Sequence, residues 1–195
     1  GATGRVIAAL VGGQLGLHSA MAGLRMAAPL EALNEGYSAW TVGVLLALFA
    51  AAPVLLALPT GRAADRHGYH RPVRYAVLIS TAGMLLAVAS TFVEGRPRFA
   101  LLCVAAALAG TGANTGMLTI QRTAGLAARD GTERVRVFSW LGIAPSFSNV
   151  IGPVAVGFMI DGLGFRAGYL MLLALPLLTV ASARLVPRLP PPDPA

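Results

Sequence analysis

The residues best suited to chemistry in this sequence interrupt its first long apolar stretch. Gln14, His18 and Arg25 lie within the run from Val6 to Leu30. At about 100° per residue of an α-helix, their side chains fall within about 40° of one another and form one polar stripe. Histidine can exchange a proton near neutral pH, a guanidinium can bind an anion, and an amide can donate and accept hydrogen bonds. The stripe therefore has the chemistry to bind a polar or acidic solute and to carry a proton.

Each of these residues also has a plainer explanation. Arg25 could extend to the lipid headgroups, His18 could be a packing residue, and Gln14 could bridge two helices. Asn114, in a later apolar run, is the best cavity candidate there, and an interhelical hydrogen bond explains it equally well. The sequence offers these four residues as candidates for a solute cavity.

Six apolar runs supply the elements that could position these side chains. A bilayer core about 30 Å thick requires about 20 helical residues, and only helices satisfy every backbone group of such runs in lipid. Of all residues, 56% are hydrophobic and 12% are charged, against about 25% charged in soluble domains. The runs are Val6–Leu30, Trp40–Pro59, Val73–Val93, Phe99–Ile120, Val135–Ile160 and Ala167–Val186. The sequence therefore predicts an all-α membrane protein with six transmembrane helices.

The arginines predict the orientation of these helices. Eleven of them lie at the N-terminus, in or within three residues of the second and fourth connections, or at or just after the end of the last run, and three lie in the opposite loops at Arg96, Arg98 and Arg166. Positively charged loops stay in the cytoplasm, so both termini are expected there. The net charge of +7 does not indicate nucleic acid binding, because the arginines occupy short loops between apolar runs.

Two further groups of residues form motifs. The first lies in the segment GRAADRHGYHR and the second in the fifth apolar run. In the segment, we expect glycines to permit close helix approach and a turn, the aspartate to accept from helix N-terminal amides, and an arginine to pair with acids. The first group is Gly61, Asp65, Arg66, Gly68 and Arg71; the second is Gly142, Asn149, Gly152, Pro153 and Gly157. The glycines and the proline of the fifth run predict a narrow face that packs tightly on a partner helix.

Both groups resemble motifs of the major facilitator superfamily. The first resembles its loop signature between helices two and three, and the second its glycine–proline motif in helix five. The resemblance implies a six-helix N-terminal half, residues 1–186, built as a 3+3 inverted repeat over about 5–93 and 99–186. It implies a surface latch in the first loop and a solute cavity shared with a C-terminal half or a second copy. Residues 187–195 would be a proline-rich cytoplasmic tail or a linker between halves.

The function expected from the resemblance is secondary-active transport of a small solute by alternating access. Proton-coupled efflux or antiport across a bacterial inner membrane is one form of it, and a non-transporting scaffold is the alternative. No GxSxG, HExxH or GxxxxGK[ST] motif is present, and the single Cys103 has no metal-ligand partners in the sequence. We therefore expect no enzyme activity, cofactor or metal, and as partners a small-molecule substrate and the lipid bilayer, but no nucleic acid.

Overall fold

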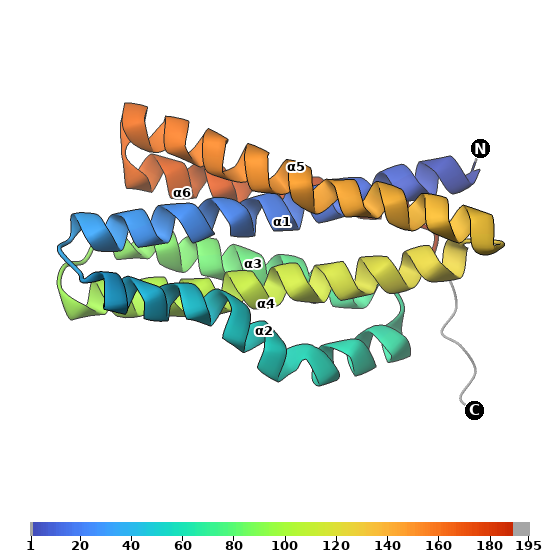
Figure 1. Ribbon diagram of the computed structural model, residues 1–195, viewed down its shortest axis with the longest axis horizontal. Coiled ribbons are helices and arrows are strands. Elements are labelled where there is room, and N and C mark those ends of the chain that lie inside the picture. Colours follow the sequence, from blue (N-terminus) through green and yellow to red (C-terminus); the bar gives the residue numbers. More distant parts are fainter. Residues whose placement is uncertain (1, 189–195) are drawn as a thin grey trace.

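The structure, a computed structural model, describes residues 2–188 of the chain. This part folds into seven helices that run side by side as an elongated bundle (Figure 1). Six segments are long and apolar enough to cross a membrane, which confirms the predicted number of spans. The helices are α1 (Ala2–Asn34), α2 (Ala39–His67), α3 (His70–Ser90), α4 (Arg96–Ala127), α5 (Gly131–Leu163), α6 (Phe165–Ala174) and α7 (Pro176–Ala183).

The sixth span differs from its prediction because it consists of two helices. α6 ends at Ala174 and α7 begins at Pro176, with Leu175 between them. Proline has no backbone N–H and its ring opposes the preceding turn, so the regular helix stops there. Together the two helices still form one apolar segment, Phe165–Ala183.

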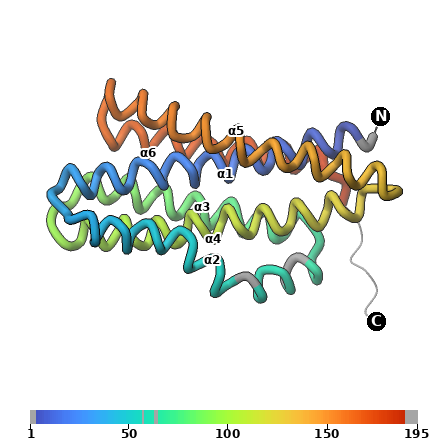
Figure 2. The backbone as a smooth tube through the Cα atoms, viewed as in Figure 1, coloured from blue at the N-terminus to red at the C-terminus, as the bar shows by residue number. Residues whose placement is uncertain are grey.

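The second span also differs from its prediction, at its C-terminal end. A loop was expected over Gly61–Arg71, but α2 continues through Pro53 and Pro59 to His67. Only Gly68 and Tyr69 form the turn before α3, and Gly68 has a φ of 72°, as its predicted role requires. The second half of α2 bends away from the bundle, which is the effect expected of prolines inside a helix (Figure 2).

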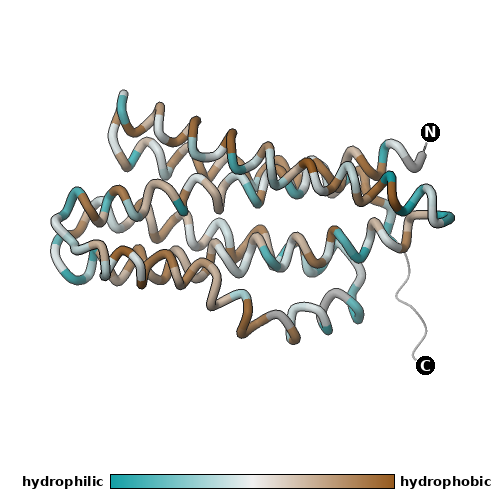
Figure 3. The backbone as a smooth tube through the Cα atoms, viewed as in Figure 1, coloured by the Kyte–Doolittle hydropathy of each residue, from teal (hydrophilic) through white to brown (hydrophobic). Residues whose placement is uncertain are grey.

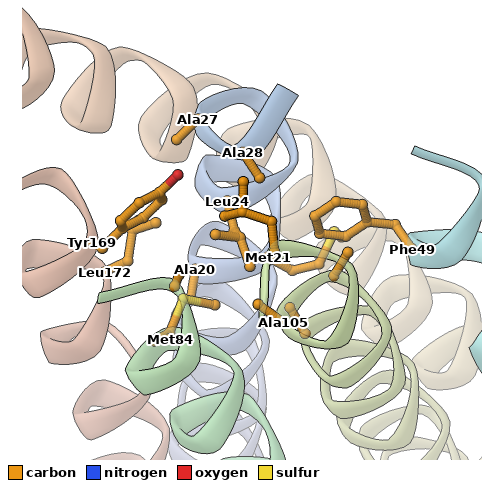
Figure 4. Packing of buried hydrophobic residues seen from close by; sticks show 14 of the residues in the cluster. Ala20, Met21, Leu24, Ala27, Ala28, Phe49, Met84, Ala105, Tyr169 and Leu172 are labelled. Carbon is orange, nitrogen blue, oxygen red and sulfur yellow. The ribbon is translucent and has the colours of Figure 1, made fainter. Parts of the chain in front are cut away.

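Small side chains set the distances between the helices. The interior cluster contains Ala20, Ala27 and Ala28 of α1, which lie among larger residues of the surrounding helices (Figure 4). Several glycines are required by close backbone approach. A Cβ on Gly110 of α4 would overlap the carbonyl oxygen of Phe49 on α2, and one on Gly152 of α5 would overlap the backbone of α1. Such contacts between small residues are the usual basis of helix packing in membranes.

The outer surface of the bundle is apolar between its ends. Hydrophilic residues gather towards the ends of the helices, and hydrophobic residues dominate between them (Figure 3). The most apolar windows of α2 and α5 are only 17% and 22% buried, the lowest fractions of the six spans. Large apolar side chains such as Leu55 on α2 and Phe158 on α5 are about four-fifths exposed. These faces must meet lipid or other protein rather than water.

Candidate functional site

A cavity of about 410 Å³ opens between α1, α2 and α4. Three of the four predicted cavity residues line it, namely His18 and Arg25 from α1 and Asn114 from α4. Most of the remaining lining is apolar, and the volume is within the range of small-molecule sites, about 300–1,000 Å³. The other lining residues are Met21, Leu46, Phe49, Ala50, Pro53, Val54, Gly110, Ala113, Met117 and Leu118.

The bend of α2 accounts for the opening of this cavity. At Phe49, α2 lies so close to α4 that only glycine fits at position 110. One turn later α2 reaches Pro53, and its second half turns away from the bundle (Figure 2). Pro53 and Val54 then form one wall of the cavity instead of filling it. Two residues therefore account for the cavity. Gly110 on α4 lets α2 approach closely, and Pro53 bends α2 away one turn later.

Arg25 is positioned by a residue of the second motif. Its Nη2 donates a hydrogen bond to Oδ1 of Asn149 on α5, over 3.0 Å. A guanidinium has five N–H donors, and this is the only bond from Arg25 to an acceptor within residues 2–188. Because Arg25 is also exposed, its remaining donors can bind an acidic or hydrogen-bonding group in the cavity. His18 lies close enough to both Arg25 and Asn149 to interact with them.

Gln14, the fourth predicted residue, does not line the cavity. Its side chain is 3% exposed, and its Oε1 has no hydrogen-bond partner among the described residues. The neighbouring Gly13 faces Tyr69, Ser182 and Ile120 at Cβ-contact distances, so helices surround α1 closely at this level. The polar stripe therefore continues from the cavity into the packed interior. A helical wheel gives the face of a residue but not which other helices cover that face at each level.

The first motif contributes an ion pair between two helices. Oδ1 of Asp65, near the end of α2, accepts a hydrogen bond from Nε of Arg122 on α4 over 2.9 Å. The expected partner of Asp65 was a helix N-terminus, and an arginine takes that place within the described chain. Asp65 is 74% exposed in its side chain, so the pair contributes at most about 1 kcal/mol to stability. The ion pair instead fixes a position, because it connects the bent half of α2 to α4.

The other residues of the first motif act locally. Arg71 donates through Nε to the hydroxyl of Tyr75, one turn further along α3, over 3.2 Å. Arg66 is exposed and forms no salt bridge within residues 2–188. Gly61 was expected to permit close helix approach, but a Cβ there would meet nothing within 4 Å. The end of α2 bends away from the neighbouring helices there, so the role of Gly61 stays a prediction.

Some residues of the second motif pack against α1, and others are exposed. Gly152 lies against the backbone of Ser19 and Gly23 on α1, and a Cβ at Gly157 would lie 3.4 Å from Cε of Met26. Pro153, beside Gly152, is accommodated inside α5. Gly142 is exposed, and its missing side chain faces nothing within 4 Å. The contacts expected of a tight face are present near Gly152, and the role of Gly142 stays a prediction.

A buried charged cluster was not predicted from the sequence. Glu31 of α1 is 0% exposed and forms a salt bridge with Arg98 of α4 over 2.7 Å. Its carboxylate also accepts from the hydroxyls of Tyr169 on α6, at 2.5 Å, and Ser90 on α3, at 3.3 Å. Arg98 pairs further with Glu35 over 2.8 Å. Four helices meet on one carboxylate whose partners are up to 138 positions away in the sequence, so spacing gave no signal.

Comparisons with known proteins agree with this architecture. Residues 10–195 match the sequence profile described as Major Facilitator Superfamily. Two Mycobacterium tuberculosis proteins, from strains CDC 1551 / Oshkosh and ATCC 25618 / H37Rv, are each named "Multidrug resistance protein B homolog" and are 35% identical to this chain over 155 residues. The aligned region covers 78% of this chain but 26% of each relative, so it spans about a quarter of their length. With six membrane-spanning segments and a profile match over nearly its whole length, the chain belongs to the Major Facilitator Superfamily.

Proposed function

We propose that this chain is the N-terminal six-helix part of a secondary-active transporter that moves a small amphipathic solute by alternating access. The observation that supports this most directly is the cavity between α1, α2 and α4, which combines an apolar lining with three polar side chains. A second six-helix half, or a second copy of the chain, would cover the exposed faces of α2 and α5. The cavity would then lie between two halves, as alternating access requires.

The chemistry of the cavity suggests what the solute is like. Its apolar walls favour a hydrophobic body, and the free donors of Arg25 favour an acidic or hydrogen-bond-accepting group. The relatives are named for multidrug resistance, which fits outward transport of compounds with an apolar body. We therefore propose efflux, with both chain termini in the cytoplasm, as the excess of arginine at that end of the bundle favours.

Proton coupling is proposed to involve His18. It is the one titratable side chain other than Arg25 among the residues that line the cavity. His18 shares the lining of the cavity with the positively charged Arg25. Protonation of His18 would therefore change the charge of the cavity at the place where the solute binds.

The test uses the complete gene product in proteoliposomes. Uptake or release is measured for matched anionic, neutral and cationic fluorescent amphiphiles. Arg25→Gln should abolish any preference for the anionic member, whereas Arg96→Gln, the same charge change at the exposed start of α4, should leave transport unchanged. Absence of flux for every amphiphile, or an equal effect of the two substitutions, would contradict the proposal.

The coupling is tested separately with His18→Gln. The wild-type protein should transport faster when a pH gradient is imposed, and the variant should lose this dependence while it still binds the solute. A variant with the wild-type response to the gradient would remove His18 from the mechanism and leave the transport proposal intact.

A further inference from the structure

A larger groove, of about 700 Å³, lies between α3 and α7, away from the solute cavity. None of its lining residues belongs to the lining of the solute cavity, and transport as proposed above makes no use of it. It occurs where α3 begins and α7 ends. Its lining residues are His70, Val73, Arg74, Val77, Leu78, Val180, Ala183, Arg184, Val186, Pro187 and Arg188.

The rim of the groove is strongly basic. Arg74, Arg184 and Arg188 all line it, and its described lining contains no acidic side chain. None of the three arginines forms a salt bridge within residues 2–188. A ring nitrogen of His70 lies 3.0 Å from the carbonyl oxygen of Ala183, and this contact holds the start of α3 against the end of α7. The fold thus gathers three arginines with no acidic partner among residues 2–188 to neutralise them.

The walls of the groove become apolar one helical turn further into the bundle. On α3, Leu78 follows Arg74 by four residues, and Val180 of α7 precedes Arg184, the residue that caps α7, by four residues. A spacing of four residues places each apolar side chain about 6 Å deeper than its arginine on the same helix face. Leu78 and Val180 are 58% and 42% exposed, so they present open apolar surface below a cationic rim. α3 and α7 run in opposite directions, so on both of them the arginine lies nearer the end of the bundle and the apolar residue lies deeper.

We propose that this groove binds one anionic phospholipid, with the phosphate of the headgroup at the three arginines and the start of an acyl chain along the apolar walls. Basic pockets between transmembrane helices are suited to anionic headgroups, especially on the cytoplasmic side. A soluble phosphate compound would use the arginines but gain nothing from Leu78 and Val180. A phospholipid uses both surfaces and reaches the groove laterally from the bilayer.

The binding is tested on the complete gene product in neutral detergent by native mass spectrometry. The protein is titrated with phosphatidylglycerol and with phosphatidylcholine of the same acyl chains. We expect one tightly bound phosphatidylglycerol and weaker binding of phosphatidylcholine. Arg74→Gln and Arg184→Gln should each weaken phosphatidylglycerol binding roughly fivefold, which corresponds to about 1 kcal/mol per arginine. Arg136→Gln, an equal charge change at an exposed arginine of α5 outside the groove, should have no effect.

Two further arms separate a lipid from a soluble anion. Leu78→Trp partly fills the groove without changing its charge and should also weaken phosphatidylglycerol binding. Glycerol phosphate, which has the charged group but no acyl chain, should not displace the bound lipid at comparable concentration. Equal binding of the two lipids, equal loss in Arg136→Gln, or displacement by glycerol phosphate would each overturn the proposal. None of these results depends on whether the protein transports a solute.

Discussion

Replacement of Arg98 by glutamine tests the buried cluster that joins α1 to three other helices. In the wild-type structure, the fully buried Glu31 carboxylate has Arg98 as its one cationic partner within residues 2–188, at 2.7 Å. At this distance, the attraction is about 6 kcal/mol for an effective dielectric constant of about 20, before the cost of desolvation. In Arg98→Gln the carboxylate keeps its hydroxyl donors but loses the charge that balances it.

Breaking a buried pair from one side typically costs about 3–5 kcal/mol. The side chain of Arg98 is 16% exposed, so some solvent screening remains and we expect a loss of about 3 kcal/mol. Glu31→Gln should cost less, about 1–2 kcal/mol, because Arg98 then retains Glu35 at 2.8 Å. The double variant leaves no buried charge unpaired and should cost little more than Arg98→Gln alone.

The assay is reversible unfolding of the purified protein by sodium dodecyl sulfate in mixed micelles, followed by tryptophan fluorescence. Arg96→Gln serves as the control for the charge change, because Arg96 is exposed at the start of the same helix. A coupling energy of at least about 1 kcal/mol between positions 31 and 98 is expected from the double-mutant cycle. Additive losses within about 0.5 kcal/mol, or a larger loss in Glu31→Gln than in Arg98→Gln, would refute the reasoning.

Three other predictions follow from the described contacts. Gly152→Ala should destabilise the protein by about 1–3 kcal/mol, because its Cβ would overlap the α1 backbone. Gly142→Ala should be neutral or stabilising by up to about 1 kcal/mol. Similar losses of stability for the two variants in the same unfolding assay would contradict this. Asp65→Asn breaks the ion pair with Arg122 and should slow transport in proteoliposomes at normal insertion and stability, and an unchanged rate would show that the ion pair is not needed. Burial raises the pKa of Tyr69, so the stability that depends on its neutral hydroxyl is complete below about pH 10 and is lost as the pH rises above that value. Tyr69→Phe should have the stability of the wild type at pH 7, because that hydroxyl has no partner among the described residues, and it should not lose stability above about pH 10. The free energy of unfolding, measured at pH 7 and above about pH 10, tests this.

The sequence was sufficient for the spans because their signal is local. An apolar run of about 20 residues is a property of the run itself, and six such runs were found where the structure has its six membrane-spanning segments. The errors occurred where a local rule competes with packing. Proline at 59 was taken as the end of a helix, yet the helix bends and continues, while proline at 176 does break the sixth span. Composition alone does not distinguish these two outcomes, because the neighbouring helices decide whether a freed backbone group is accommodated.

The candidate site was predictable only where one helix carried the information. His18 and Arg25 were identified because they share a face of α1, and both line the cavity. Gln14 shares that face but lies at a level where other helices cover it. The pairing of Arg25 with Asn149 joins positions 124 apart, and no rule of spacing relates them. The inverted-repeat arrangement remains a prediction. The role of residues 187–195 as a cytoplasmic tail or a linker also remains a prediction, and residues 189–195 lie outside the described part of the chain.

The seam between α1 and the sixth span has an evolutionary consequence. A Cβ on Gly23 would lie 2.6 Å from Cδ2 of Leu172, the end of a flexible side chain, and 3.2 Å from the carbonyl oxygen of Gly152, so a smaller residue at 172 would remove the most severe overlap of alanine at 23. A Cβ on Gly16 would lie 2.7 Å from the carbonyl oxygen of Leu175, which no mutation at a neighbouring position removes. Among homologues, positions 23 and 172 should therefore covary in size, whereas position 16 should stay glycine whatever residue accompanies it.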